Sequence, residues 1–393
     1  MPHIYNKSNR NRATVKGQRK TKKYRKRTSV VGGDVIGSGG FGCVFRPALK
    51  CKRKTKRKDH SVSKLLTRRH AKKEYDIIKR IRTKLRDIPH YSEYFLIDGV
   101  STCALAPLSE SDLSNFDEKC KVMKKYDNIT SKNVNDNLAK LRSIELPDGG
   151  ISLVAYYANM KDMGDFQFIH DQLTNLLTHA VVPMNDRHVY HADIKESNIL
   201  FNLHTQKIGL IDWGLSFYTK GGRIPKIIKN KPLQYNLPFS VVLFNKTFDA
   251  MYSTFTRTHK SPTMRDLTVF VEDYLDAWID KRGAGHMGVM DDIWKAVSDD
   301  DDVDVLRVIV VPYLADILYN YTTNGRFHKT AYFNETFLPN LDIWGLLMSY
   351  STVLEHNTFA RQSALANIYI EFLLSTASSP INVNNLVSRL KYI

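Results

Sequence analysis

The amino-acid sequence predicts an α+β fold with two parts, a small β-rich half followed by a larger helical half. Before residue 67, short apolar runs alternate with glycine-rich or charged turns, which is typical of antiparallel strands. Beyond residue 165, apolar residues recur at helical spacing over long segments. The chain has 393 residues, of which 42% are hydrophobic, so it can bury a sizeable core.

In the first half we expect several strands and one early helix. The helix is predicted by apolar residues at Ala71, Tyr75, Ile78, Ile81 and Leu85. In chain order the expected segments are a strand from residue 29 into a glycine turn at 37–42, strands at 43–49 and 60–66, the helix at 67–85, a strand at 94–108, a mostly polar, helical insertion at about 109–146, and a buried strand at 151–157.

The second half reads as a series of helices. They are expected at 165–182, 263–282, 286–297, 303–321, 339–356 and 359–376. We therefore divide the chain into a tail (1–29), a β-rich half (30–157) and a helical half (158–393), the last with an insertion at about 241–335.

The net charge of +18 is concentrated near the N-terminus. Residues 1–33 hold eleven Lys or Arg and no Asp or Glu, and a second basic stretch runs over 50–86. Segment 1–29 has almost no apolar periodicity, which predicts a disordered tail. Three interpretations of this tail stay open: a solvated segment, a site of non-specific nucleic-acid contact or nuclear import, and a docking segment for an acidic partner.

The four cysteines, Cys43, Cys51, Cys103 and Cys120, show no spacing typical of metal ligands. They predict neither a zinc site nor a disulfide framework, and they favour a reducing, intracellular setting. No apolar run approaches the length of about eighteen residues that a membrane span needs, so we expect no membrane partner.

Residues 37–44 read Gly-Ser-Gly-Gly-Phe-Gly-Cys-Val, the pattern G-x-G-x-x-G-x-V. Glycines let backbone N–H groups approach a phosphate closely, where a side chain would obstruct. The pattern also fits a simple hairpin turn or a dinucleotide site, but the latter needs a helix directly after the glycines. A strand-like segment follows here, so we favour a lid over nucleotide phosphates. The residues assigned to it are Ile36, Gly37, Ser38, Gly39, Gly40, Phe41, Gly42 and Val44.

Lys64, on the expected strand 60–66, is the candidate to pair with the phosphates of a nucleotide. It follows Gly42 by 22 residues, which leaves room for a strand and a turn. Lys50 is the alternative, but eight residues cannot supply that hairpin. Glu74, on the expected helix, is the carboxylate best placed to orient Lys64. The competing interpretation of both residues is a solvated surface charge in a basic region.

The strongest signal is segment 191–198, His-Ala-Asp-Ile-Lys-Glu-Ser-Asn, followed by Asp-Trp-Gly at 212–214. Asp193 can orient and deprotonate an attacking hydroxyl, and Lys195 can neutralise a phosphoryl group in transfer. Asn198 and Asp212 supply oxygen ligands of the kind that Mg²⁺ prefers. Each of these residues alone is common in turns and caps. Four in this order, among apolar strand-like segments, are far less expected by chance.

From about residue 30 to residue 390, these motifs resemble the eukaryotic-type protein kinase superfamily. The resemblance implies a two-lobed protein-kinase-like fold with ATP and Mg²⁺ as cofactors. Lys195, two residues after the catalytic Asp193, is similar to serine/threonine kinases and implies protein substrates with Ser or Thr acceptors. Segment 153–158 looks like the strand and hinge beside adenine, with Tyr156 and Ala158 binding ATP. Asp342 would tie down the catalytic loop.

Three features are similar to divergent kinases of large DNA viruses. They are the Val-Ser-Lys form at 62–64, the short gap to the following helix, and segment 234–240 in place of the usual A-P-E. A viral protein of this kind would be found in the host cytoplasm, the virion or the nucleus. Ala192 replaces the Arg that often clamps a phosphorylated activation loop in the family. We therefore expect activity without phosphorylation of Thr219 or Ser216.

The sequence leaves two alternatives to an active protein kinase. One is a pseudokinase, which would bind nucleotide and recruit partners as a scaffold. The other is a lipid or small-molecule kinase. Retention of Lys64, Asp193, Asn198 and Asp212 argues against a scaffold, because a scaffold has no physical need for all four. The glycine loop and Lys195 favour protein substrates over small molecules.

Overall fold

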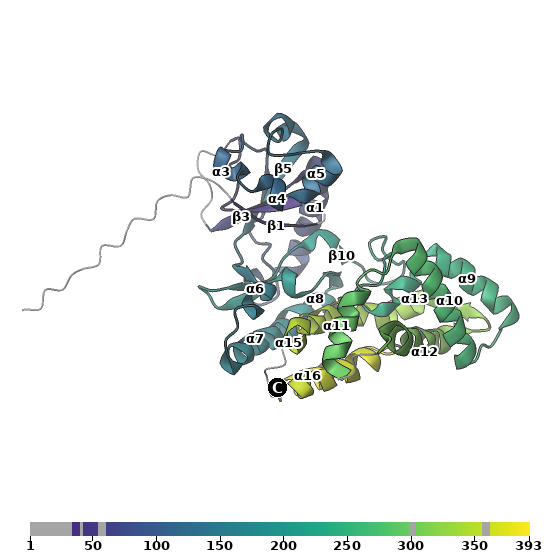
Figure 1. Cartoon of the computed structure of the whole chain (residues 1–393). Coiled ribbons are helices and arrows are strands. Elements are labelled where there is room, and N and C mark those ends of the chain that lie inside the picture. Colours follow the sequence, from purple (N-terminus) through teal and green to yellow (C-terminus); the bar gives the residue numbers. More distant parts are fainter. Residues whose placement is uncertain (1–33, 40–41, 54–59, 299–302, 356–361) are drawn as a thin grey trace, which may run out of the picture. The chain divides into compact units, whose positions relative to one another are not determined.

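The structure is a computed structural model that describes residues 34–39, 42–53, 60–298, 303–355 and 362–393 (Figure 1). Residues 32–393 form one compact unit with a small antiparallel sheet region and a larger helical part, which confirms the predicted α+β class. The predicted tail (1–29) and two residues of the glycine loop, Gly40 and Phe41, lie outside the described residues. The partners proposed for the tail therefore stay predictions.

Five antiparallel strands form the main sheet in the order β1-β2-β3-β5-β4. Their bounds are Asp34–Ser38 (β1), Gly42–Arg46 (β2), Ser61–Thr67 (β3), Ser101–Cys103 (β4) and Leu141–Pro147 (β5). Val44 of β2 pairs with Lys64 of β3, and Lys64 in turn pairs with Ile144 of β5. The predicted strand–turn–strand start and the predicted third strand are confirmed, although β2 ends at Arg46.

Helix α1 (Arg68–Leu85) confirms the predicted early helix. Its buried residues are Ala71, Glu74, Ile78, Ile81 and Leu85, which follow one face of a 3.6-residue period. A carboxylate on this apolar face is unusual, because burial of an unpaired charge is costly. Glu74 lies on the buried face of α1, so it is not a solvated surface charge.

The insertion between β4 and β5 is helical, as predicted, and packs against the sheet. It contains α3 (Glu110–Leu113), α4 (Phe116–Lys119), α5 (Lys121–Asp127) and the 3₁₀ turn η1 (Asn135–Lys140). Phe116 and Met123 join Phe45 and Leu65 in a buried core. The predicted end of the insertion at residue 146 is wrong, because residues 141–147 form strand β5 beside β3.

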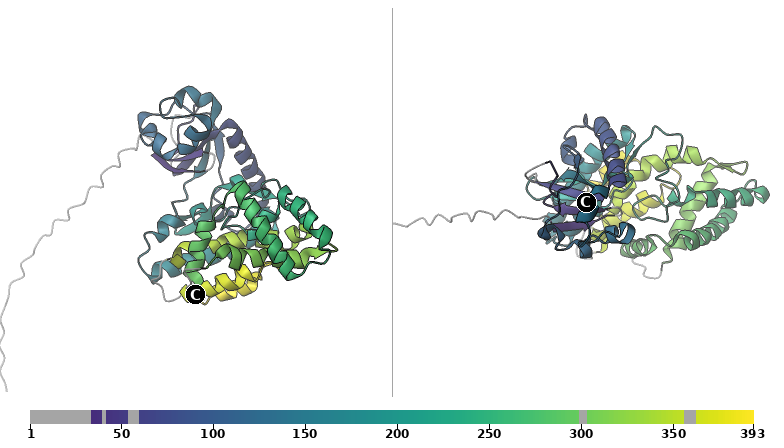
Figure 2. Two further views of the ribbon diagram at one scale, coloured as in Figure 1. Left: turned by 45° about the vertical axis from the view of Figure 1, so that its right-hand side comes forward. Right: turned by 90° about the horizontal axis from the view of Figure 1, so that it is seen from above.

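Helices dominate the described part of the chain after β5 (Figure 2). Their bounds are α7 (Met163–Leu176), α8 (Val182–Asp186), α9 (Lys246–Thr258), α10 (Met264–Arg282), α11 (Met287–Ser298), α12 (Val311–Tyr321), α13 (Lys329–Tyr332), α14 (Leu338–Met348), α15 (Ser351–Glu355), α16 (Gln362–Tyr369) and α17 (Val383–Leu390). Turns of π-helix join α7 to α8 (Leu177–Val181), precede α12 (Leu306–Val310), join α13 to α14 (Phe333–Phe337) and follow α16 (Ile370–Leu374). The predicted helical segments are present, and several are divided in two.

Short strands and turns carry the polar motifs between these helices. β6 (Ile151–Ser152), β8 (Ile199–Asn202) and β9 (Lys207–Leu210) form one small sheet, and β7 (Val189–Tyr190) pairs with β10 (Phe217–Tyr218). The remaining short elements are α2 (Tyr91–Tyr94), η3 (Glu196–Asn198), η4 (Trp213–Leu215), η5 (Phe239–Leu243), β11 (Thr322–Thr323) and β12 (Arg326–Phe327).

Two predicted strands are largely wrong. Within 94–108, strand structure is confined to β4 and an isolated bridge between Cys51 and Leu105. Within 151–157, strand structure ends at Ser152, and α6 (Leu153–Tyr157) follows. The Ser152 side chain accepts a hydrogen bond from the backbone N–H of Ala155, so it caps this helix. A short apolar run such as 153–157 is compatible with either helix or strand, which explains the error.

The prediction of four unpaired cysteines is also wrong. The structure joins Cys43 to Cys120 and Cys51 to Cys103 as disulfides, with Cα atoms 5.5 Å and 5.8 Å apart. These pairs are separated by 77 and 52 residues, so no spacing rule in the sequence reveals them. Among the helices that the structure describes, none combines the length and apolar character needed to cross a lipid bilayer.

Candidate functional site

A cavity of about 660 Å³ brings together most of the residues that the sequence singles out. Strands β1, β2 and β3 contribute one side, and the segments around η3 and η4 contribute another. The predicted site residues that line it are Ile36, Gly37, Ser38, Gly39, Val44, Lys64, Glu74, Asp193, Lys195, Asn198 and Asp212. Residues as far apart in sequence as Ile36 and Asp212 therefore converge on one space.

Lys64 forms the centre of this site. Its Nζ lies 3.0 Å from Glu74 Oε1 and 2.9 Å from Asp212 Oδ1. Lys64 and Glu74 are each 7% exposed, so both charges are almost fully removed from water. Breaking such a buried pair by removing one partner is strongly destabilising, because it leaves an uncompensated charge. Lys50, the alternative to Lys64, is exposed and does not line the cavity.

The protonation of this trio follows from its packing. Burial alone would lower the pKa of Lys64, but the charges of Asp212 and Glu74 outweigh it and raise the pKa above its ordinary value. Burial also works to raise the pKa of Asp212, yet Lys64 holds it below the usual value. At Glu74, burial prevails and raises the pKa. Lys64 is therefore a permanent cation at the site.

Asp193 is held by side chains on both sides. Asn198 Nδ2 donates to the Asp193 carboxylate at 2.9 Å and to the Asp193 carbonyl oxygen at 2.8 Å. Lys195 Nζ lies 3.3 Å from Asp193 Oδ1. The amide nitrogen of Asn198 makes both bonds, so its amide oxygen is the atom presented to a cation. This arrangement fixes the direction of the Asp193 carboxylate.

Asp342 of α14 holds the segment that carries Asp193 in place through hydrogen bonds. The two carboxylate oxygens of Asp342 accept the backbone N–H groups of His191 and Ala192, each at 2.8 Å. Ala192 has φ of 60°, a left-handed conformation that Ala adopts only under constraint. Asp342 supplies that constraint, as the sequence predicted. Burial raises the pKa of Asp342 to about 7, against the effect of the two backbone bonds.

His191 connects the segment that carries Asp193 to the segment that carries Asp212. Its Nε2 donates to the Ile211 carbonyl oxygen at 2.9 Å, and its ring packs against Trp213 with centroids 4.7 Å apart. Burial lowers the pKa of His191, so the ring is neutral at pH 7. These contacts give His191 a structural role, because its ring holds the two segments against each other. Asp212, which follows Ile211, has φ of 60°, a left-handed conformation that Asp tolerates better than most residues.

Tyr156 and Ala158, predicted to bind ATP, do not line the cavity. Tyr156 donates its hydroxyl to the Asp165 carbonyl oxygen and packs on Phe201, while Ala158 ends α6. The cavity is lined instead by the linker 146–152, together with Val154 and Ala155. This linker includes the last two residues of β5 and continues through β6, so the sequence analysis placed the edge of the site several residues too late.

The glycine loop meets the site through Gly39. A Cβ atom built on Gly39 would lie 3.8 Å from Asp212 Oδ2, so the loop backbone passes close to the acidic group. Gly42 has a different role. A Cβ atom there would approach the Leu65 carbonyl oxygen to 2.2 Å, so glycine is required for the pairing of β2 with β3. Gly42 does not line the cavity.

The sequence analysis did not assign Arg46 to the site. Arg46 Nη2 donates to Asp148 Oδ1 at 2.5 Å and to the Gly150 carbonyl oxygen at 2.6 Å. These bonds tie β2 to the linker at the edge of the cavity. The Pro-Asp-Gly-Gly turn at 147–150 was the available signal, but nothing in the sequence pairs it with Arg46.

Asn236 was also missed as a site residue. Its Nδ2 donates to Asp193 Oδ1 at 3.0 Å and to the Ile194 carbonyl oxygen at 3.2 Å. The neighbouring Tyr235 donates its hydroxyl to the Glu196 carboxylate at 2.9 Å. Segment 234–240 therefore lies directly against the Asp193 loop. The sequence analysis noted this segment only as standing in place of the usual A-P-E, and its contacts depend on the tertiary fold.

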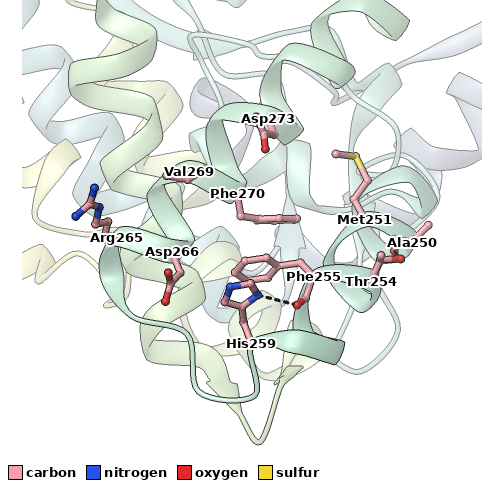
Figure 3. Close-up of a pocket in the computed structure, with 10 residues that line it drawn as sticks. All are labelled: Ala250, Met251, Thr254, Phe255, His259, Arg265, Asp266, Val269, Phe270 and Asp273. Carbon is pink, nitrogen blue, oxygen red and sulfur yellow. Dashed lines mark hydrogen bonds between the residues drawn. The ribbon is translucent and has the colours of Figure 1, made fainter.

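A second cavity, of about 670 Å³, lies between α9 and α10 (Figure 3). Phe255 and Phe270, which both line it, pack against each other with centroids 4.7 Å apart, and His259 stacks on Phe255. Its carboxylate Asp266 is engaged in the N-terminal cap of α10 with Thr263. This cavity has none of the predicted site residues, so it does not compete with the first as the candidate site.

In comparisons with known proteins, no family model matches the chain. No curated protein matches it either. The chemistry of the site must therefore be argued from its geometry. A permanent cation, two fixed carboxylates, an amide oxygen and a glycine loop around one cavity are suited to bind a polyphosphate with a divalent cation.

Proposed function

We propose that the chain is an ATP- and Mg²⁺-dependent protein kinase that transfers the γ-phosphoryl group to Ser or Thr of protein substrates. The proposal includes a two-lobed protein-kinase-like fold, with the nucleotide between the sheet region and the helical part. Its main support is the buried contact of Lys64 with both Glu74 and Asp212. These three residues come from β3, α1 and the segment after β9.

Residues on both sides of the cavity fit a bound nucleotide. Lys64 would pair with the phosphates, and the backbone of the glycine loop would cover them. The linker 146–152, which lines the cavity, would offer backbone groups to the adenine in place of Tyr156 and Ala158. Asn198 and Asp212 offer amide and carboxylate oxygens, the donor set that Mg²⁺ prefers. When bound there, Mg²⁺ supplies neutralisation of phosphate charge.

The acceptor side of the site is built around Asp193. The bonds from Asn198 and Asn236 fix its carboxylate, which can orient an attacking hydroxyl and accept its proton. Lys195, beside Asp193, would stabilise charge on the phosphoryl group in transfer. Most of the catalytic effect would then come from positioning and preorganised charge.

The test is transfer of labelled γ-phosphate from Mg-ATP to a panel of acidic and basic proteins, lipids and small alcohols. Asp193→Ala should lower transfer by at least about 100-fold, the usual lower bound for losing a positioned acid–base group. Asp212→Asn should also lower transfer strongly, because it removes a carboxylate proposed to hold Mg²⁺. Asp76→Asn is the matched control, because Asp76 is an exposed carboxylate on α1 that pairs with Lys72. This control should keep wild-type activity.

Each outcome has a defined meaning. Transfer to protein Ser or Thr that is lost in both site variants supports the proposal. Transfer to a lipid or a small alcohol, without transfer to protein, would keep the chemistry and replace the substrate class. Nucleotide binding without transfer to any acceptor would contradict catalysis and favour a scaffold that binds nucleotide.

A further inference from the structure

Two sulfur atoms and a carboxylate oxygen, all able to bind a metal ion, lie close together in the sheet region, outside the proposed nucleotide site. The Sγ atoms of Cys51 and Cys103 and a carboxylate oxygen of Glu145 all lie within 4.8 Å of one another. Cys51 and Glu145 are each 3% exposed. None of these residues lines the proposed nucleotide cavity. The cluster is therefore a separate feature that the proposed kinase activity does not use.

The backbone brings the two cysteines together. Lys52 N donates to the Ala104 carbonyl oxygen at 2.8 Å, and Ala106 N donates to the Lys50 carbonyl oxygen at 2.9 Å. These bonds flank the isolated bridge between Cys51 and Leu105. The ladder holds Cys51 next to the end of β4 by main-chain bonds as well as by the disulfide. These main-chain bonds would remain when the disulfide is reduced.

Glu145 is oriented toward the sulfurs by its neighbours on the sheet. It pairs with Ser101 of β4, and the Ser101 hydroxyl donates to Glu145 Oε2 at 2.7 Å. The other carboxylate oxygen, Oε1, lies 3.2 Å from Cys51 Sγ. A disulfide sulfur has no proton to donate, so this approach is favourable only with a proton or a cation between the two atoms. A second hydrogen bond that orients a ligating carboxylate is typical of metal sites.

We propose that, when its thiols are reduced, the chain binds one Zn²⁺ through Cys51, Cys103 and Glu145. Two thiolates and a carboxylate form a donor set that zinc accepts, with a fourth position left for water or another ligand. That position would open to a cavity of about 620 Å³ that both cysteines line.

Charge balance supports such a complex. Two thiolates, one carboxylate and Zn²⁺ sum to a single negative charge. The cavity beside the sulfurs is lined by three cationic side chains, Lys52, Arg53 and Arg142. These cations would offset the net charge of the complex.

The zinc-bound state and the disulfide of the structure exclude each other, because the same sulfur electrons form either bond. With hydrogen peroxide as oxidant, the two thiolates give up two electrons and form the S–S bond. The peroxide O–O bond breaks, two protons are taken up, and two water molecules and free Zn²⁺ are released. The site thus couples metal retention to the redox state of Cys51 and Cys103.

The second cysteine pair provides a matched control. Cys43 and Cys120 are also joined and are buried in the same half of the chain. Among the described residues they belong to no group of three metal-ligating side chains. Their neighbours are the apolar core residues Phe45, Phe116 and Met123. Substituting this pair removes two sulfurs without removing the proposed site.

The test uses the full chain, reduced and freed of metal, and titrated with Zn²⁺ in competition with a chromophoric chelator. Wild type and the Cys43→Ser/Cys120→Ser control should bind one equivalent. Cys103→Ser should weaken binding by more than about 100-fold, and Glu145→Gln by about 10- to 100-fold. Replacing Zn²⁺ with Co²⁺ should give a thiolate-to-cobalt charge-transfer band in wild type that is lost in Cys103→Ser.

A measurement on the wild type alone guards against variants that fail to fold. Zn²⁺ should slow alkylation of Cys51 and Cys103, identified by mass spectrometry, while Cys43 and Cys120 serve as internal references. Peroxide should release the bound Zn²⁺ as the Cys51–Cys103 disulfide forms. Binding below one equivalent, a cobalt spectrum without the charge-transfer band, or alkylation unaffected by Zn²⁺ would each overturn the proposal.

Discussion

Replacing Gly345 with alanine should disturb the Asp193 loop from a position that does not line the proposed nucleotide cavity. Gly345 lies inside α14, three residues after Asp342. A Cβ atom there would lie 2.6 Å from the Ile194 carbonyl oxygen, 3.1 Å from Ile194 Cβ and 3.2 Å from the Asn236 carbonyl oxygen. The closest of these contacts is to backbone, which cannot rotate away. The loop must therefore move.

Two opposing effects set the size of the change in stability. Overpacking a buried contact typically costs about 1–3 kcal/mol. Alanine in place of glycine inside a helix returns about 1 kcal/mol. The net loss in the free energy of unfolding should therefore be up to about 2 kcal/mol. Ile194 lies between Asp193 and Lys195, so a shift near 1 Å should also lower kcat by roughly 10- to 100-fold.

Gly288→Ala is the matched control. Gly288 lies in α11, and a Cβ atom there would have no heavy atom within 4 Å. This variant should leave transfer unchanged and should add at most about 1 kcal/mol to stability. Urea denaturation and phosphotransfer measure the two effects. If Gly345→Ala matches Gly288→Ala in both, the packing argument is refuted. The stability readout is independent of the proposed function.

Three further predictions follow from the contacts around the site. Burial raises the pKa of Asp342 to about 7, so the folded chain keeps a proton on Asp342 that the unfolded chain releases above about pH 4. Relative to Asp342→Asn, the wild type should therefore lose up to about 4 kcal/mol of stability as the pH rises from about 4 to about 7. Urea-unfolding measurements in which both proteins change in parallel with pH would contradict this. Thr219→Ala should keep transfer within about twofold of wild type. The Thr219 hydroxyl bonds to Gly221 of its own turn, and residue 192 is Ala, so it has no guanidinium to bind a phosphate on Thr219. Complete loss of transfer would refute the expectation that activity does not need phosphorylation of Thr219. Arg46→Ala removes bonds to the linker and should weaken nucleotide binding by about 1 kcal/mol, or roughly fivefold in Kd by calorimetry; an unchanged Kd would show that the linker needs no tether.

Elements with a strong local signal were predictable from the sequence. α1 and α10 match the expected segments closely, because apolar residues at helical spacing define a buried face over several turns. β3 was predictable as an apolar run between a charged turn and a helix start. The residues of the Asp193 loop could be singled out because their types and order are rare together.

β5 could not be predicted, because its buried side chains include polar ones. Ser143 and Glu145 are fully or almost fully buried, and they read as part of a polar insertion. Such residues are tolerated inside a sheet only when partners satisfy them. The partner given to Glu145 by the neighbouring strand is Ser101, more than 40 residues away. The disulfide pairing escaped prediction for the same reason.

The sequence by itself singled out the residues proposed for phosphoryl transfer and the elements with a strong local signal, such as α1, α10 and β3. Both depend on residue type and on contacts within a few turns of the chain. Only the tertiary structure decided which of those residues meet. Lys64 and Asp212 are 148 residues apart in sequence, yet Lys64 Nζ lies 2.9 Å from Asp212 Oδ1. Asn236 donates a hydrogen bond to Asp193, which is 43 residues away in sequence. Long-range burial sets these distances, because desolvated charges and amides must find partners wherever the fold brings them together.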